Sequence, residues 1–313
     1  MTEFLNRSTL SLGKLRRLQQ AASPGGTFTV LAIDHRGPLR RRMARDPALA
    51  GADVDGAVAL LKQDIVRALA PSASAVLLDP EGGIEACVRA GALPGSSGLL
   101  VALDTGSTGD PAVLETGLVP GWSPERIARS GGSGLKLLVY YHPETPEAAA
   151  VEQVVRQVAA ACAASELPLY LEPLSYRPGD MARPLTSAER RPVVVETARR
   201  LVPLGVDILK AEFPVDPVET PDEGLWREAC AELSEASAVP WVLLSAGVGY
   251  ETFLRQTQIA GEAGGSGVIA GRAIWNEAVT ADGAARRGFL QAQGRDRMRR
   301  LRELCDGVSR PIW

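Results

Sequence analysis

Lysine is scarce in this chain, and two of its lysines lie in apolar runs that are typical of strands. Four of the 34 basic residues are lysines, and Lys136 and Lys210 are the two that close such runs. A desolvated lysine can lose its proton and attack a carbonyl carbon to form a Schiff base, whereas the guanidinium of arginine stays charged. Both residues are therefore candidates for chemistry. The other two lie in polar helical segments, where we expect no chemical role: Lys14 and Lys62.

We interpret Lys210 as the nucleophile and Lys136 as its neighbouring cation. Burial and a nearby positive charge both lower the pKa of a lysine and release free amine near neutral pH. The alternative for each residue is a lysine whose stem is buried while its ammonium group reaches solvent.

Glu172 ends another apolar run and is followed by Pro173, which we expect to terminate the strand. A carboxylate at this place can shuttle protons, and nearby ammonium groups would keep it ionised at rest. The alternative is a structural ion pair with Lys136 or Lys210. That role and proton transfer are compatible.

Asp34 ends the first apolar run in the same way and opens the segment 34–37. Gly37 is expected to allow a tight turn there. His35 and Arg36 are candidates for contact with substrate, and the alternative for both is a solvated loop residue.

Two short segments near the C-terminus combine small residues with an arginine. Ser245 and Gly247 follow one apolar run, and Gly271 and Arg272 follow the next. Small residues let backbone N–H groups approach an anion, a helix N-terminus adds positive potential, and arginine supplies a forked clamp. These segments predict a phosphate site.

Eight apolar runs alternate with helical patterns, which predicts repeated βα units. We expect one (β/α)8 barrel across residues 1–313, a single domain with an N-terminal helical extension, and the doubly wound open sheet is the main competitor. The expected strands are 27–33, 75–78, 98–102, 135–139, 167–171, 206–209, 241–244 and 267–270. The expected helices are 54–70, 146–164, 187–201, 222–237, 250–263 and 283–304.

The barrel is favoured because polar residues repeatedly follow the strands, and active sites of such barrels lie at the carboxyl ends of the strands. Lys136 and Lys210 would then face each other across the barrel. Ser187 is expected to cap its helix, and the last helix either closes the barrel or lies at a subunit interface. The polar strand ends are Asp34, Asp79, Lys136, Glu172, Lys210, Ser245 and Arg272.

Composition narrows the classes of ligand. A net charge of −3 with interspersed signs provides no basic stripe for nucleic acid, so we expect a small-molecule substrate. No signal peptide or membrane span is evident, which favours the cytoplasm and no membrane partner. The chain has two histidines and four scattered cysteines, so we expect no zinc site built from several imidazoles and no disulfide. A Mg²⁺ site made of carboxylates stays open on these counts, and we expect no other cofactor. A homo-oligomer is possible.

Seven segments occur in an order that resembles the tagatose 1,6-bisphosphate aldolase family of class I aldolases, together with sulfofructose-phosphate aldolase. They are AIDHRG at 32–37, LLDPEGG at 77–83, GLKLLVYYHP at 134–143, YLEPLSY at 170–176, DILKAEFPVD at 207–216, LLSAGVG at 243–249 and GVIAGRAIW at 267–275. The resemblance implies a metal-free barrel with Lys210 as Schiff-base lysine and Asp34, Lys136 and Glu172 in support. It also implies that the phosphate of the dihydroxyacetone moiety lies on Ser245, Gly247, Gly271 and Arg272.

Two departures concern the substrate. His35 stands where this family usually has glutamine, and the segment 103–109 lacks the lysine and tyrosine found after the third strand in tagatose enzymes. The resemblance therefore implies cleavage of a ketose 1,6-bisphosphate, such as tagatose 1,6-bisphosphate, to dihydroxyacetone phosphate and glyceraldehyde 3-phosphate. Two alternatives stay open, an aldolase for 6-deoxy-6-sulfofructose 1-phosphate and a non-catalytic sugar-phosphate sensor.

Overall fold

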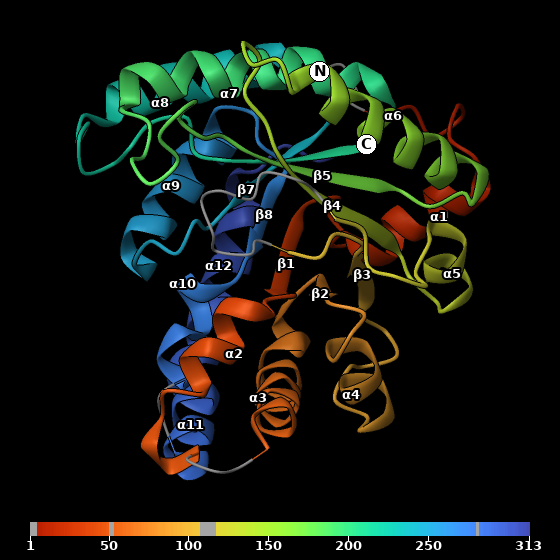
Figure 1. Ribbon diagram of the computed structural model, residues 1–313, viewed down its shortest axis with the longest axis vertical. Coiled ribbons are helices and arrows are strands. Elements are labelled where there is room, and N and C mark those ends of the chain that lie inside the picture. Colours follow the sequence, from red (N-terminus) through yellow and green to blue (C-terminus); the bar gives the residue numbers. More distant parts are fainter. Residues whose placement is uncertain (1–4, 50–52, 107–116, 280–281) are drawn as a thin grey trace.

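Eight parallel strands close into a barrel in the order of the chain (Figure 1). A computed structural model describes residues 5–49, 53–106, 117–279 and 282–313. β1 pairs with both β2 and β8, which confirms the barrel and rules out the open sheet. The strands are β1 Phe28–Ile33, β2 Ala75–Leu78, β3 Gly98–Ala102, β4 Gly134–Tyr140, β5 Leu169–Leu174, β6 Ile208–Ala211, β7 Trp241–Leu244 and β8 Gly267–Ala270.

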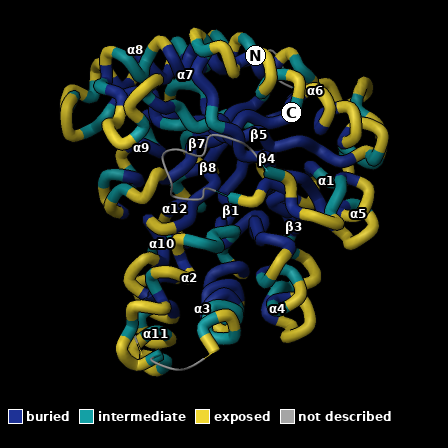
Figure 2. The backbone as a smooth tube through the Cα atoms, in the orientation of Figure 1, coloured by how far each residue is buried: buried dark blue, intermediate teal, exposed yellow. Residues whose placement is uncertain are grey.

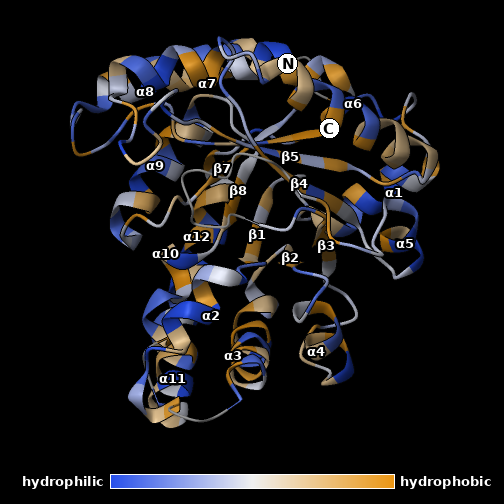
Figure 3. Cartoon of the chain, in the orientation of Figure 1, coloured by the Kyte–Doolittle hydropathy of each residue, from blue (hydrophilic) through white to orange (hydrophobic). Residues whose placement is uncertain are grey.

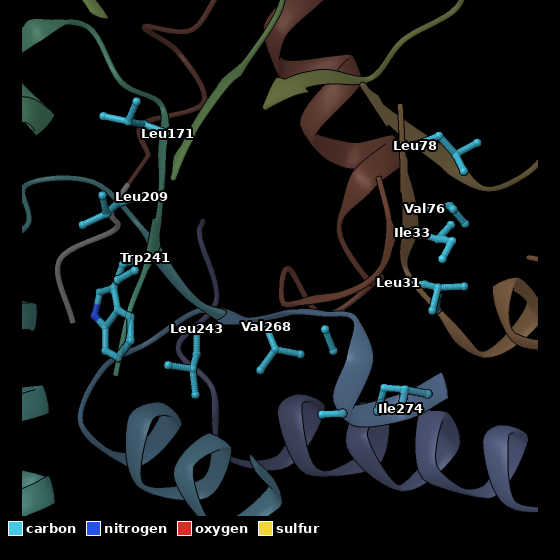
Figure 4. Packing of buried hydrophobic residues seen from close by; sticks show 14 of the residues in the cluster. Leu31, Ile33, Val76, Leu78, Leu171, Leu209, Trp241, Leu243, Val268 and Ile274 are labelled. Atoms are coloured by element: carbon cyan, nitrogen blue, oxygen red, sulfur yellow. The ribbon is translucent and has the colours of Figure 1, made fainter. Parts of the chain in front are cut away.

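The strands are buried on both faces, and the two faces have different partners. Leu31, Ile33 and Leu209 point outward into the layer between barrel and helices (Figure 4). Val30 and Ile208 point into the barrel and belong to a second, inner cluster. Because successive side chains of a strand alternate between its faces, every second residue lies inside the barrel. Figure 3 shows that hydrophobic residues are concentrated in the strands.

The helices surround this barrel, and their outer surfaces are exposed (Figure 2). None of the helices in the described part of the chain has the length and apolar character of a membrane span. The helices are α1 Leu12–Ala21, α2 Gly37–Met43, α3 Val54–Leu69, α4 Gly83–Arg89, α5 Pro124–Arg129, α6 Ala148–Ala164, α7 Ser187–Leu201, α8 Glu223–Ala236, α9 Tyr250–Glu262, α10 Arg272–Trp275, α11 Gly283–Phe289 and α12 Arg295–Val308. The described residues also form four short 3₁₀ turns and one π-helical turn: Pro47–Leu49, Ala70–Ser72, Val202–Leu204, Asn276–Val279 and the π-helical Leu290–Gly294.

The predicted last helix is interrupted, and its C-terminal part closes the ring of helices. The π-helical turn Leu290–Gly294 separates α11 from α12. α12 packs between α9 and α3, and the Tyr250 hydroxyl donates to the Arg297 carbonyl oxygen. Of the two roles expected for this helix, closing the barrel is the one that the structure confirms.

Three predicted positions along the strands and helices are wrong. β5 continues through Pro173, which lies beyond the point where pairing with β6 ends at Leu171, so no bond to β6 is lost there. Lys136 is the third residue of β4 rather than near its end. The cap of α7 is Thr186, which forms a capping box with Glu189, so the predicted cap Ser187 is the first helical residue.

The amino-terminal helix α1 closes the end of the barrel that lies opposite the carboxyl ends of the strands. Its Gln20 carbonyl oxygen would be 2.5 Å from a Cβ placed on Gly98 at the start of β3, so only glycine fits there. The Lys14 ammonium bonds both oxygens of Asp207, at 2.7 and 2.8 Å. Lys14 therefore has a structural ion pair at this end.

Candidate functional site

A cavity of about 480 Å³ lies at the carboxyl ends of the strands, and it contains nearly all residues that the sequence analysis selected. Gly247 and Asp79 are not among the lining residues. Because the side-chain period of a strand is two, Lys136, Glu172 and Lys210 point inward, between outward neighbours such as Leu135 and Leu171. The predicted residues that line the cavity are Asp34, His35, Arg36, Lys136, Glu172, Lys210, Ser245, Gly271 and Arg272.

Glu172 bridges the two inner lysines. Its Oε1 lies 2.7 Å from the Lys210 Nζ, and its Oε2 lies 2.8 Å from the Lys136 Nζ. The two ammonium groups were expected to face each other and repel. The structure places a carboxylate between them, so the site holds a chain of alternating charge instead.

Lys136 is held by three carboxylates. Its Nζ lies 3.1 Å from Asp34 Oδ2, 3.2 Å from Asp104 Oδ2 and 2.8 Å from Glu172 Oε2, and its side chain is 2% exposed. Burial alone would lower the pKa of Lys136, but the three carboxylates outweigh burial and raise the pKa above its usual range. Lys136 therefore carries a positive charge at neutral pH.

The same charges act on the carboxylates. Burial would raise the pKa of Asp34, yet Lys136 and Lys210 hold that pKa well below its usual range. Glu172 behaves alike, because burial opposes ionisation while the two ammonium groups lower its pKa. Asp34 and Glu172 are therefore ionised at neutral pH.

Asp104 belongs to the site, and the sequence analysis did not select it. Its Oδ2 accepts the Leu138 N–H at 3.0 Å, its Oδ1 accepts the Gly106 N–H at 2.9 Å, and its carboxylate contacts Lys136. Asp104 lies two residues after the end of the third apolar run. A search for polar residues just after each strand, extended to β3, would have selected it.

His35 and Arg36 both lie at the cavity wall. The His35 ring packs edge-on against Trp275, with 5.1 Å between ring centroids, and burial lowers the pKa of His35 to about 4. The imidazole is therefore neutral at neutral pH. Arg36 donates to Glu81 at 3.0 Å and to the Asp104 carbonyl oxygen, so neither residue is a freely solvated loop residue.

The segments after β7 and β8 form one concave corner. Gly271 N–H donates to Ser245 Oγ at 3.3 Å. Ala246 and Gly247 both have left-handed backbone, with φ of 45° and 80°. A Cβ on Gly247 would lie 3.1 Å from Arg272 Cζ, so glycine lets the guanidinium lie flat on the loop. Within the described residues, no side-chain hydrogen bond or ion pair occupies Arg272.

Asp79 differs from the other polar strand ends, because its carboxylate faces α3 rather than the cavity. It forms an ion pair with Lys62, and each side chain is 2% exposed. Lys62 has no place at the site, as expected, but its setting is buried rather than polar. Asp79 Oδ2 also accepts the N–H groups of Gly82 and Gly83 at the start of α4.

A family model for DeoC/LacD aldolases matches residues 28–277, which span the whole barrel. The chain belongs to the DeoC/LacD aldolase family. Tagatose 1,6-diphosphate aldolase 2 of Enterococcus faecalis is 32% identical to this aldolase over 328 aligned positions, covering 96% of each chain. Tagatose 1,6-diphosphate aldolase of Listeria monocytogenes is 31% identical, covering 97% of this chain and 95% of that protein. The resemblance seen in the sequence motifs is thereby confirmed.

Solved structures share the fold of this aldolase at low sequence identity. An archaeal fructose 1,6-bisphosphate aldolase is 19% identical, with a TM-score of 0.61 and coverage of 93% of this chain and 98% of that chain. Fructose-bisphosphate aldolase from Plasmodium falciparum is 13% identical, with a TM-score of 0.68 and coverage of 96% and 97%. These likenesses support the barrel fold.

Proposed function

We propose that this aldolase is a class I enzyme in which Lys210 forms a Schiff base with a ketose 1,6-bisphosphate such as tagatose 1,6-bisphosphate. Its products would be dihydroxyacetone phosphate and glyceraldehyde 3-phosphate. The observation that carries the proposal is the shared carboxylate of Glu172, which contacts both the Lys210 and the Lys136 ammonium groups. The names of the relatives support the choice of substrate.

Proton transfer between Lys210 and Glu172 starts the proposed reaction. Their contact of 2.7 Å lets Glu172 accept a proton from Lys210, and the free amine then attacks the C2 carbonyl. The fixed charge of Lys136 stabilises the negative charge that develops on the C2 oxygen. Glu172 returns its proton as the carbinolamine loses water, and the iminium becomes the electron acceptor for C3–C4 cleavage.

Binding and orientation of the substrate are assigned to the cavity wall. The 1-phosphate would lie in the corner made by Ser245, Gly247, Gly271 and Arg272, where Arg272 has room for a new partner. His35 and Arg36 follow β1, which pairs with β8, and they are proposed to contact the substrate near that corner. Asp34 holds Lys136 in place at 3.1 Å. The proposed chemistry needs no metal or other cofactor.

The test is a cleavage assay on a panel of ketose bisphosphates and sulfonated ketose phosphates, with Lys210→Arg beside the native protein. Lys210→Arg should abolish cleavage because a guanidinium forms no Schiff base. Lys14→Arg is the matched control and should keep full activity. Near-normal turnover by Lys210→Arg would refute the Schiff-base proposal.

The panel also separates the alternatives. Preference for 6-deoxy-6-sulfofructose 1-phosphate would identify a sulfosugar aldolase, and tight binding without turnover would identify a sensor. The segment that motivates the first alternative runs from Leu103 to 109, and its residues 107–109 lie outside the described part of the chain. We place the proposed reaction in the cytoplasm because its substrate is a phosphorylated sugar.

A further inference from the structure

An ion pair at the cavity wall includes a carboxylate to which the mechanism above gives no role. Arg36 lines the cavity, and its Nη1 donates to Glu81 Oε2 at 3.0 Å. Glu81 lies in the loop after β2 and is not among the lining residues. Its side chain is 55% exposed, against 12% for Arg36. Arg36 therefore connects the cavity to an exposed carboxylate.

Three contacts besides Glu81 fix the Arg36 guanidinium. Its Nη2 donates to the Asp104 carbonyl oxygen and lies 3.5 Å from Asp104 Oδ1. Gly106 has left-handed backbone, with φ of 79°, and a Cβ there would lie 3.3 Å from Arg36 Nη2. Glycine thus lets the guanidinium lie close against the loop after β3. Because these contacts do not involve Glu81, the position of Arg36 does not depend on that carboxylate.

The order of the strands indicates which end of a substrate the Arg36 guanidinium faces. β1 pairs with β8 on one side and with β2 on the other. Arg36 follows β1, and its partners Glu81 and Asp104 follow β2 and β3, so its guanidinium reaches away from β8. The proposed 1-phosphate corner follows β7 and β8, and β3 and β4 lie opposite that corner in the barrel. A ketose joined to Lys210 at C2 would extend its far end toward that opposite side.

The cavity offers few positive charges to a second anion. Its described lining residues include four lysine or arginine side chains: Arg36, Lys136, Lys210 and Arg272. Lys136 is held by three carboxylates, Lys210 is the proposed nucleophile, and Arg272 belongs to the 1-phosphate corner. This leaves Arg36 for a 6-phosphate, and arginine binds phosphate through paired N–H groups. Within the described residues its buried Nε makes no hydrogen bond, so it has a donor to spare.

Glu81 and a 6-phosphate would compete for the same guanidinium. The Arg36 Nη1 donates to Glu81, so it becomes fully available to a phosphate oxygen only when Glu81 moves away. Glu81 is able to move, because more than half of its side chain is exposed and water can replace Arg36 as its partner. An ion pair with an exposed member is weak. A phosphate dianion can therefore displace Glu81, but part of its binding free energy is lost in doing so.

We propose that Glu81 is a specificity-determining residue that acts through Arg36: it pairs with the guanidinium in the free enzyme, and the 6-phosphate of the substrate displaces it. This inference rests on the proposed function. A ketose 1-phosphate has no distal anion and leaves the pair of Arg36 and Glu81 in place. Glu81 therefore sets how strongly the enzyme favours a ketose with two anionic groups over a ketose with one.

Steady-state kinetics of Glu81→Gln test this inference. The amide keeps the shape of the side chain and loses its charge, so the Arg36 guanidinium becomes available to the substrate. We expect KM for tagatose 1,6-bisphosphate to fall by about two- to fivefold at low ionic strength, the size expected for loss of a weak competing ion pair. kcat should stay at the native value, because the 6-phosphate is bound alike before and during cleavage. The inhibition constant of tagatose 1-phosphate should not change.

Two further variants serve as controls. Glu85→Gln removes the same charge from α4, where Glu85 pairs with Arg89 at 2.8 Å on the exposed surface, and its KM should equal that of the native enzyme. In the background of Arg36→Gln, the change Glu81→Gln should no longer lower KM, because Glu81 acts only through that guanidinium.

Three results for Glu81→Gln would overturn the inference. An unchanged KM would show that Glu81 does not compete with the substrate. A raised KM would show that Glu81 instead holds Arg36 in place for the substrate. Equal shifts for tagatose 1,6-bisphosphate and tagatose 1-phosphate would show that its charge acts on any anion. Failure of the native protein to cleave any ketose bisphosphate or to form an adduct on Lys210 would refute the proposed function itself.

Discussion

Two lysines of the same barrel differ because of the atoms around their ammonium groups. Lys136 has three carboxylates within 3.2 Å, whereas Lys210 has one partner, Glu172, within the described residues. The proposed Schiff-base site rests on this arrangement, in which one lysine has three carboxylate partners and its neighbour has one. The two residues are of the same type, so this difference in carboxylate partners depends on which side chains the strands bring together.

Asp104 offers a direct test of the carboxylate cluster. In Asp104→Asn the residue stays similar in shape, but Lys136 loses one of three negative neighbours, and its position should become less fixed. We predict that kcat falls by about tenfold, equal to about 1.4 kcal/mol of transition-state free energy, while borohydride trapping at Lys210 persists. Asp46→Asn, at an exposed turn, is the control. An unchanged kcat would show that two carboxylates suffice.

His35 makes the folded protein sensitive to acid. Burial lowers the pKa of His35 from 6.5 to about 4. Between these two pH values His35 is protonated in the unfolded chain and neutral in the folded chain. The free energy of unfolding therefore falls as pH drops from 6.5 toward 4. At pH 5 this effect amounts to about 2 kcal/mol.

We therefore predict that the native protein loses about 2 kcal/mol more than His35→Gln between pH 7.5 and pH 5. Urea unfolding of both proteins at the two pH values measures this difference. Equal losses would mean that His35 has an ordinary pKa in the folded state.

At the scale of elements, the two-residue period of the strands made much of the site predictable. Lys210, Glu172 and Asp34 follow or end apolar runs, and the structure places all three at one cavity. The fifth run was misjudged because Pro173 was taken as a stop, although a proline is tolerated where the ladder on one side has already ended.

The position of Lys136 could not be predicted from its own run. Its side chain is long enough to reach the cavity from the third residue of β4, so the strand continues well past it. Asp104 was missed although it follows its run by two residues, as Arg272 does, because the segment 103–109 was compared only for the lysine and tyrosine of tagatose enzymes.

The buried pair of Lys62 and Asp79 joins α3 to the end of β2. Lys62→Met should lower the free energy of unfolding by about 3–5 kcal/mol, because Asp79 is left as an unpaired buried charge. The double variant Lys62→Met, Asp79→Asn removes that charge and keeps an acceptor for the N–H groups of Gly82 and Gly83, so it should lose less. Urea unfolding compares the two, and a single variant as stable as the double one would contradict the prediction.

At the scale of the whole molecule, the four lysines lie in four different environments. Lys14 pairs with Asp207 beneath the barrel, Lys62 lies between barrel and helix, and Lys136 is enclosed by carboxylates inside. Lys210 alone combines a place at the cavity with a single carboxylate partner among the described residues. A reagent that labels lysine through an iminium should therefore label Lys210 and leave the other three lysines unlabelled.

The most direct test of the proposed chemistry is borohydride trapping with dihydroxyacetone phosphate, followed by intact mass and peptide mapping. We predict one adduct per chain, located on Lys210 and absent from Lys210→Arg. An adduct on Lys136, or no adduct although the ligand is shown to bind, would contradict the assignment of Lys210 as the Schiff-base lysine.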